Sequence, residues 1–338
     1  MRSDLPADIP AEPAQPENTP GEPAWREGIP AEPAQPEDTP GEPAQPDSIP
    51  AEPPAPESVP EDPAQRERRS GRNLPAAVAV GLGLGGIAIL TLFTVKATFL
   101  AFVGTVVAVA LWELNRAVAA RQIRLPVIPI AAGGAVAFVL AYWQGERAVL
   151  VSIAITMTAV LAWRLPGGTD GYLRDVTAGA FALAYLPLAA SFVGLMLAPA
   201  DGPRRTLTFL ILTVCSDVGG YAAGITVGRH LMAAAISPRK TWEGFAGSAL
   251  FCLLGGALSL PLLLHGAIWQ GLLLGAAVLA FAALGDLVES MIKRDLGIKD
   301  MGSVLPGHGG ILDRIDAMLI TAPVTWLLLL VFIPVTHH

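Results

Sequence analysis

Apolar stretches of membrane-spanning length follow one another through most of this 338-residue chain. A helix needs about 20 apolar residues to cross a hydrocarbon core of about 30 Å. Nine such stretches can be counted, near residues 74–94, 97–112, 125–142, 147–163, 175–198, 205–227, 244–264, 267–289 and 311–334. A hydrophobic fraction of 52% and a mean hydropathy of +0.52 agree with this count. The sequence therefore predicts an all-α, polytopic membrane protein with about nine transmembrane helices and excludes an ordinary soluble domain.

The N-terminal segment differs in kind, because residues 1–65 repeat with a period of about ten. Proline recurs at every tenth position, and an acidic residue follows each of these prolines two positions later. So short a Pro- and Glu-rich unit cannot bury a core, and we expect a disordered acidic tail, with partner binding as the alternative. We divide the chain into this tail with its basic juxtamembrane end (1–73), N-terminal transmembrane helices (74–209) and a C-terminal catalytic region (210–338).

Charge is distributed unevenly along the chain. Residues 1–65 carry 15 acidic side chains against two arginines, whereas the remainder carries 14 acidic and 20 basic side chains. A basic membrane body suits an anionic substrate or anionic lipids, although cytoplasmic loops are Lys/Arg-rich in any membrane protein. The arginine-rich segment 66–72 places the N-terminus in the cytoplasm. Alternate threading of nine helices puts the later basic loops on that side too, except Arg204 and Arg205, which leaves the topology near 199–210 open.

The densest charge lies between the last two apolar stretches, where residues 290–316 hold eight charged side chains around a Pro-Gly-His-Gly-Gly turn. Ionisable groups at a bilayer are costly unless they pair, bind ions or face water, so they indicate a functional site. Asp286, Glu289, Ser290 and Lys293 are spaced i, i+3, i+4 and i+7 and share one helix face. Snorkelling at a helix end accounts for Glu289 and Lys293 but not for Asp286, which lies a turn deeper.

Asp313 and Asp316 stand three residues apart at the start of the last helix, directly after Gly309 and Gly310. With Asp286 nearby, their carboxylates make a ligand set for a hard cation such as Mg²⁺. Helix capping is the alternative explanation for one of the two. The bare backbone of the glycine pair can approach an anion at the positive end of the helix. We therefore predict a metal and phosphate site here.

Two upstream segments add polar groups. Asp217 lies inside the sixth apolar stretch on a face of small residues, which indicates a cavity wall, with close helix packing as the alternative. The segment 237–244 sets Arg239 and Lys240 beside hydroxyl groups, and these cations are suited to grip phosphates. The chain has no P-loop and no Ser-His-Asp arrangement, and among its five histidines only His308 lies near other candidates.

Together these residues resemble the signature of the phosphatidate cytidylyltransferases, the CDP-diacylglycerol synthases. The matching positions are Ser290, Lys293, Arg294, Lys299, Asp300, Gly302, Leu305, Pro306, His308, Gly309, Gly310, Asp313, Arg314 and Asp316, with Asp217, Tyr221, Gly224 and the 237–244 segment upstream. Gly220 stands where the family is expected to have alanine, and Arg239 where lysine is usual. The resemblance is strong over about 210–320, only hydropathic over 74–209 and absent from the tail.

The resemblance implies the reaction CTP + phosphatidate → CDP-diacylglycerol + pyrophosphate, with Mg²⁺ and room for a second cation. The implied catalytic residues are Asp286, Asp313, Lys293 and His308, and the implied metal ligands are Asp217, Asp286, Asp313 and Asp316. The implied CTP and phosphate ligands are Ser237, Arg239, Lys240, Thr241, Ser290, Arg294, Lys299, Gly309, Gly310 and Arg314. Expected partners are CTP, phosphatidic acid and membrane lipids but no nucleic acid, and the oligomeric state is open, a homodimer included. The expected location is a bacterial plasma membrane, with N-terminus and active site facing the cytoplasm.

The chemistry of such a transfer agrees with the residues present. A lipid phosphate monoester is largely ionised near neutral pH, with a second pKa of about 6 by analogy with phosphoserine, so it needs positioning rather than a general base. Two other classes stay open. A transporter of an anionic solute would be expected to show an internal repeat, and none is visible in the sequence. Another lipid enzyme, such as a CDP-alcohol phosphotransferase or a polyprenol kinase, would differ in its nucleotide preference.

Overall fold

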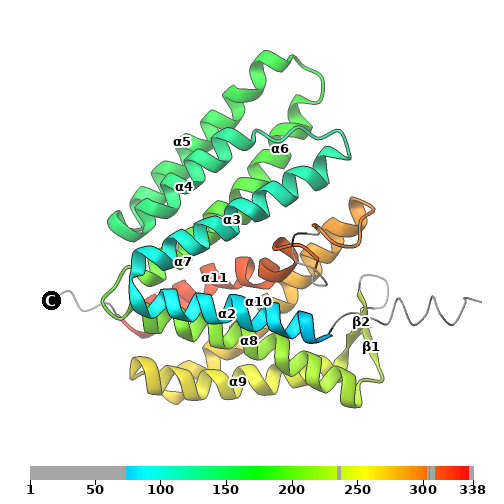
Figure 1. Ribbon diagram of the computed structural model, residues 1–338. Helices are drawn as coiled ribbons and strands as arrows, with labels where there is room; N and C mark the ends of the chain where they lie inside the picture. The colour runs from blue at the N-terminus through cyan, green and yellow to red at the C-terminus, as the bar shows by residue number, and fades with distance from the viewer. Residues whose placement is uncertain (1–73, 234–236, 303, 305–308, 335–338) are drawn as a thin grey trace, which may run out of the picture. The chain divides into compact units, whose positions relative to one another are not determined.

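The computed structural model of the protein describes residues 74–233, 237–302, 304 and 309–334, and helices dominate this part of the chain (Figure 1). The elements are α2 (Leu74–Thr94), α3 (Lys96–Ala119), α4 (Val127–Gln144), α5 (Glu146–Arg164), η1 (Leu165–Gly167), α6 (Tyr172–Leu183), η2 (Ala184–Leu188), α7 (Ala189–Leu197), α8 (Gly202–Val227), β1 (Leu231–Ala233), β2 (Ser237–Thr241), α9 (Trp242–Leu264), α10 (Ile268–Asp295) and α11 (Leu312–Phe332). The predicted helical fold class is confirmed. The predicted tail, 1–73, lies outside the described residues.

The exception to an all-α fold is a small hairpin between α8 and α9. Strands β1 and β2 pair antiparallel, with Leu231 opposite Thr241 and Ala233 opposite Ser237. The sequence indicates a loop over residues 237–244 and predicts no strand there. The backbone hydrogen bonds of the hairpin instead give Lys240 a fixed place directly before the first turn of α9.

Eight helical runs in the described part of the chain are long and apolar enough to cross a membrane. These runs are α3, α4, α5 with η1, α6 through α7, α8, α9, α10 and α11. Helix α2 contributes a shorter apolar stretch, Gly81–Thr94. The protein is thus polytopic, while the count of nine transmembrane helices stays a prediction.

The fifth predicted span is one helical run with an irregular turn in its middle. Helix α6 passes into the π-helical turn η2, which contains Pro187, and then into α7. Proline has no backbone N–H and interrupts the helical hydrogen bonding, so the extra residue of a π turn accommodates it. The turn lets one long buried run continue past the proline, with Tyr185 inside the turn.

Helices α8, α9 and α10 pack closely because glycines face each other between them. A side chain at Gly256 on α9 would collide with the carbonyl oxygen of Gly271 on α10, and the reverse also holds. Between α8 and α9, the carbonyl oxygen of Gly247 leaves no room for a Cβ on Gly219. Such small-residue contacts are typical of helix packing in membranes. They bring the polar positions of three helices into reach of one another.

Helix α11 contacts α3, α7, α8, α10 and η2, and its C-terminal end is held by Arg205 of α8. The buried Arg205 side chain donates to the carbonyl oxygens of Leu329 (3.3 Å) and Ile333 (2.8 Å) and to Asp201 Oδ1 (2.9 Å). A cation is favoured at the carbonyl end of a helix. This structural role accounts for a basic residue at the end of the bundle opposite to the other basic segments.

Candidate active site

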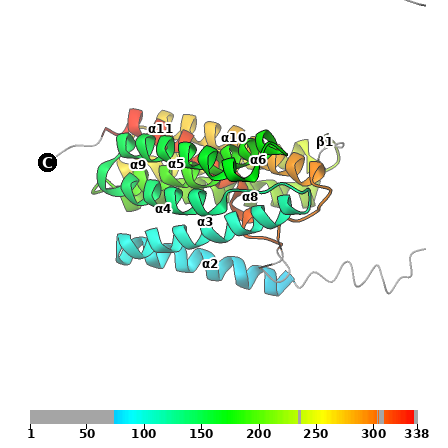
Figure 2. The same cartoon turned by 90° about the horizontal axis from the view of Figure 1, so that it is seen from above.

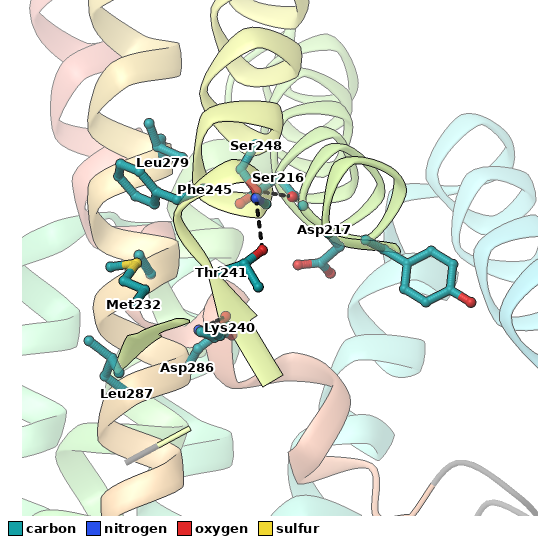
Figure 3. A pocket seen from close by; sticks show the side chains of 15 residues that line it. Ser216, Asp217, Met232, Lys240, Thr241, Phe245, Ser248, Leu279, Asp286 and Leu287 are labelled. Carbon is teal, nitrogen blue, oxygen red and sulfur yellow. Dashed lines mark hydrogen bonds and ion pairs between the residues drawn. The ribbon is translucent and has the colours of Figure 1, made fainter. Parts of the chain in front are cut away.

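A cavity of about 280 Å³ lies where α8, α9, α10 and the hairpin meet (Figure 3). Its polar side chains come from four elements, and Leu279, Ala283, Leu287, Phe245 and Met232 form much of the apolar wall. The polar lining residues are Ser216, Asp217, Tyr221, Lys240, Thr241, Ser248 and Asp286. The prediction that Asp217 marks a cavity wall is confirmed, since its carboxylate faces this space beside Lys240 and Thr241.

One ion pair crosses the cavity, between Lys240 on β2 and Asp286 on α10. Both side chains are about one-third exposed, at 29% and 34%. Asp217 is close enough to both residues for its charge to interact with those of Lys240 and Asp286. One cation and two carboxylates from three elements thus meet in a space that is open to solvent. A buried ion pair that only stabilises the fold would be closed to water, so this arrangement indicates a binding site for a charged ligand.

The hydroxyl groups of the cavity hold its walls. Thr241 is the N-cap of α9, and its Oγ1 accepts the backbone N–H of Gly244 at 3.1 Å. Ser248 donates to the carbonyl oxygen of Ser216 on α8 at 2.6 Å. Thr241, predicted as a phosphate ligand, therefore has a capping role in addition to its place in the lining.

A second cluster lies one turn further along α10. Lys293 Nζ donates to Glu289 Oε2 at 2.5 Å and to Asp313 Oδ1 at 3.1 Å. Glu289 is only 4% exposed, so the interpretation of Glu289 and Lys293 as snorkelling groups is wrong. Helix periodicity places Glu289 and Asp286 on one stripe, but α11 covers the stripe at Glu289 and leaves Asp286 facing the cavity.

Asp313 organises the loop before α11. Its carboxylate accepts the backbone N–H of Met301 (3.0 and 3.1 Å) and of Gly310 (2.7 Å) as well as Lys293. Gly309 has φ +82°, a left-handed conformation that glycine adopts without strain. Because both oxygens of Asp313 accept protein donors, Asp313 holds the glycine loop in place, while its predicted role as a metal ligand stays a prediction.

Glu113 of α3 belongs to the same region, and our sequence analysis missed it. Its side chain is 1% exposed and accepts the backbone N–H groups of Ile311 (3.1 Å) and Leu312 (2.9 Å). A Cβ on Gly302 or Gly310 would collide with this carboxylate, which explains glycine at both positions. The available signal was a single carboxylate directly after the apolar stretch 97–112.

Tyr185 in η2 was also missed. Its side chain is buried, and its hydroxyl has no hydrogen-bond partner among the described residues. The charges of Asp316, Glu289, Asp286 and Asp313 all act on this hydroxyl. The ring stacks on Phe181 with centroids 5.1 Å apart. A neutral donor thus lies next to the acidic cluster, and no pattern in the sequence pointed to it.

The two clusters adjoin through Asp316. Asp316 is buried on α11, close enough to Asp286, Asp217 and Glu289 for the charges of these carboxylates to act on it. Within the described ranges, no three His, Cys, Asp or Glu side chains are placed to hold a metal ion together. Mg²⁺ commonly takes one or two protein carboxylates plus substrate phosphates and water, so Asp217 and Asp286 fit such an ion together with a nucleotide.

The remaining predicted residues surround these clusters or lie beyond what is described. Ser290 is half-buried on α10, whereas Arg294, Lys299 and Arg314 are exposed near the same end of the bundle. Ser237 and Arg239 lie in β2, but their side chains are not among those described. His308 lies outside the described residues.

Known proteins match this chain over nearly all of the part that follows the N-terminal tail. The model of the cytidylyltransferase family matches residues 75–332. A phosphatidate cytidylyltransferase of Mycobacterium leprae is 39% identical over 277 residues, covering 77% of this chain and 89% of that protein. The enzyme of the same name from Mycobacterium tuberculosis is 39% identical, covering 77% and 84%. That of Pseudomonas aeruginosa is 33% identical, covering 75% and 94%.

Proposed function

The chain belongs to the cytidylyltransferase family, and on this premise we propose that it transfers CMP from CTP to phosphatidate in the membrane. A phosphate oxygen of phosphatidate attacks the α-phosphorus of CTP, the bond from that phosphorus to the bridging oxygen breaks, and pyrophosphate leaves. The products are CDP-diacylglycerol and pyrophosphate. The observation that carries this proposal is the cavity in which Lys240, Asp217 and Asp286 meet.

The metal in this proposal is Mg²⁺, held by Asp217 and Asp286 with Asp316 close behind them. When bound, the ion would neutralise charge on the triphosphate and stabilise the leaving pyrophosphate. Lys240 pairs with Asp286 and would turn to a phosphate oxygen of a nucleotide that enters the cavity. The chain would then supply positioning and charge compensation, which are the main demands of phosphoryl-type transfer.

The second cluster would present the phosphate-binding backbone. Asp313, held by Lys293, fixes the amide groups of Met301 and Gly310. Glycine amides before the N-terminus of α11 can bind a phosphate oxygen at the positive end of a helix. We propose that Arg294, Lys299 and Arg314 screen the triphosphate from the rim, while Lys293 acts through the loop that Asp313 organises.

The active site would face the cytoplasm, where CTP is available. Arg116 lies in the last turn of α3, and Arg121 and Arg124 follow that helix. Lys293 and Arg294 lie in the last turn of α10, at the end of the bundle that carries the cavity. Basic residues at one end of a helical membrane protein favour the cytoplasmic side. The bacterial relatives support a bacterial plasma membrane as the location.

The test is pyrophosphate release by the purified full chain in detergent with CTP, phosphatidate and Mg²⁺. We expect turnover only when all three are present, a lipid product carrying cytidine, and little turnover with ATP. A kinase would prefer ATP and release no pyrophosphate, and a CDP-alcohol phosphotransferase would need a CDP-lipid as substrate. Either result would overturn the proposal.

A further inference from the structure

A second cavity, an apolar groove of about 720 Å³, runs between α3, α4 and the η2–α7 segment. Its floor includes Leu100, Phe138, Pro187 and Ala190, and Gly104 gives it width. The groove shares no lining residue with the cavity of Lys240 and Asp286. It is therefore a separate site, on the face of the bundle where α3 contacts α4, with α2 on α3 as well (Figure 2).

The apolar lining of the groove is suited to a hydrocarbon chain. On α3 the groove extends from Ala97 to Trp112, a rise of about 24 Å at 1.5 Å per residue, which approaches the thickness of a hydrocarbon core. The hydroxyl of Thr105, its one hydroxyl, already donates to Ala101 O at 2.8 Å. Apart from the indole N–H groups of Trp112 and Trp143, nothing in the lining offers a polar ligand a partner. An acyl chain fits these conditions.

One end of the groove carries a cation. The guanidinium of Arg116 lies over the ring of Trp112, 5.6 Å from its centroid, and Trp112 is a lining residue. Arg116 is exposed in the last turn of α3 and makes no ion pair with any side chain in the described ranges. A tryptophan with a stacked arginine at the water-facing end of an acyl-sized groove is complementary to a lipid phosphate.

We propose that this groove binds one anionic glycerophospholipid of the bilayer, with an acyl chain along α3 and its phosphate against Arg116. The bound lipid is a resident component of the protein and is not the molecule that reacts, because the groove shares no lining residue with the cavity of Lys240 and Asp286. This goes beyond the proposed transfer of CMP and does not depend on it.

The test counts bound lipid by native mass spectrometry on the purified full chain, titrated in detergent with dioleoyl phosphatidylglycerol or, in parallel, with dioleoyl phosphatidylcholine. We expect one phosphatidylglycerol to be retained in preference to phosphatidylcholine. Gly104→Leu should weaken both lipids about tenfold or more, because the added side chain enters the groove. A Cβ at Gly104 meets only Phe138, at 3.9 Å, so the substitution fills the groove without a clash at the backbone.

Arg116→Gln should weaken phosphatidylglycerol about fivefold and phosphatidylcholine less, because the choline ammonium offsets the charge of the phosphate that both lipids carry. Because Arg116 is exposed, Arg116→Gln should fold normally, and it therefore tests the proposal even if Gly104→Leu fails to fold. The matched controls are Gly83→Leu on α2, where a Cβ meets nothing within 4 Å, and Arg204→Gln, an exposed cation at the start of α8. Retention of wild-type lipid binding by both groove variants, or an equal loss in the controls, would overturn the proposal.

Discussion

Glu113 on α3 accepts the backbone N–H of Leu312, the first residue of α11, at 2.9 Å. The two residues are 199 positions apart, and the contact joins the N-terminal helices to the loop that carries the family signature. The carboxylate supplies α11 with a cap that its own N-cap residue, Ile311, cannot provide. The N-terminal helices therefore take part in shaping the candidate active site.

Removing the Glu113 carboxylate should destabilise the protein. Glu113→Ala leaves the buried N–H of Leu312 and the partly buried N–H of Ile311 without this acceptor, and hydrogen bonds to charged groups contribute about 1.5–3 kcal/mol each. We expect the midpoint of thermal unfolding in detergent to fall by several degrees and turnover to fall with it. Glu146→Ala, an exposed carboxylate in the first turn of α5, is the control. Equal midpoints for the two variants would contradict this role.

The contacts of Asp313 predict a loss of turnover through loop disorder. Asp313→Asn keeps the size of the side chain, but its amide group faces backbone donors at Met301 and Gly310. Misplacement of a binding loop by about 1 Å can cost about a hundredfold in rate, and we expect a loss of that order. The Mg²⁺ concentration for half-maximal activity should stay unchanged in steady-state assays. A large shift in that concentration would instead make Asp313 a metal ligand.

Asp286 should behave in the opposite way. Asp286→Asn removes one of the two carboxylates that face the cavity and frees Lys240 from its pair. We expect the Mg²⁺ requirement to rise on the order of tenfold or more, measured by titrating Mg²⁺ after removal of metal with a chelator. Asp170→Asn, an exposed residue before α6, should leave the titration unchanged. An unaltered Mg²⁺ requirement in Asp286→Asn would remove Asp286 from the metal site.

The contrast between Asp286 and Glu289 shows which part of the site could be predicted from sequence. Helical spacing placed both on one face, and the chemistry of the region followed from the charge in an apolar setting. Spacing along one helix does not reveal where α11 crosses, and that crossing buries Glu289 while Asp286 stays open to the cavity. The depth of each carboxylate therefore required the packing of α10 against α11.

Glu113 and Tyr185 show the same limit over longer range. Both reach the site from the part of the chain where only hydropathy was expected to match, although the family model covers this part too, and their partners lie more than a hundred residues away. The helical spans themselves were predictable, since membrane-spanning length and apolarity are local properties. The hairpin was not, because the segment 231–241 is short and its pairing depends on the backbone between α8 and α9.

Arg205 provides a stability test far from the chemistry. Arg205→Met keeps an apolar stem but removes the donors to Leu329 O, Ile333 O and Asp201. Because the guanidinium is buried, we expect a loss of about 2–4 kcal/mol, seen as a fall of several degrees in the thermal midpoint. Turnover per folded molecule should stay near wild type, since these contacts lie at the opposite end of α11 from Asp313. The control is Arg204→Met, which removes an exposed neighbouring cation and should leave the thermal midpoint unchanged. If Arg204→Met lowered the midpoint as much as Arg205→Met does, positive charge alone, rather than the contacts with the carbonyl oxygens, would stabilise this end of the bundle.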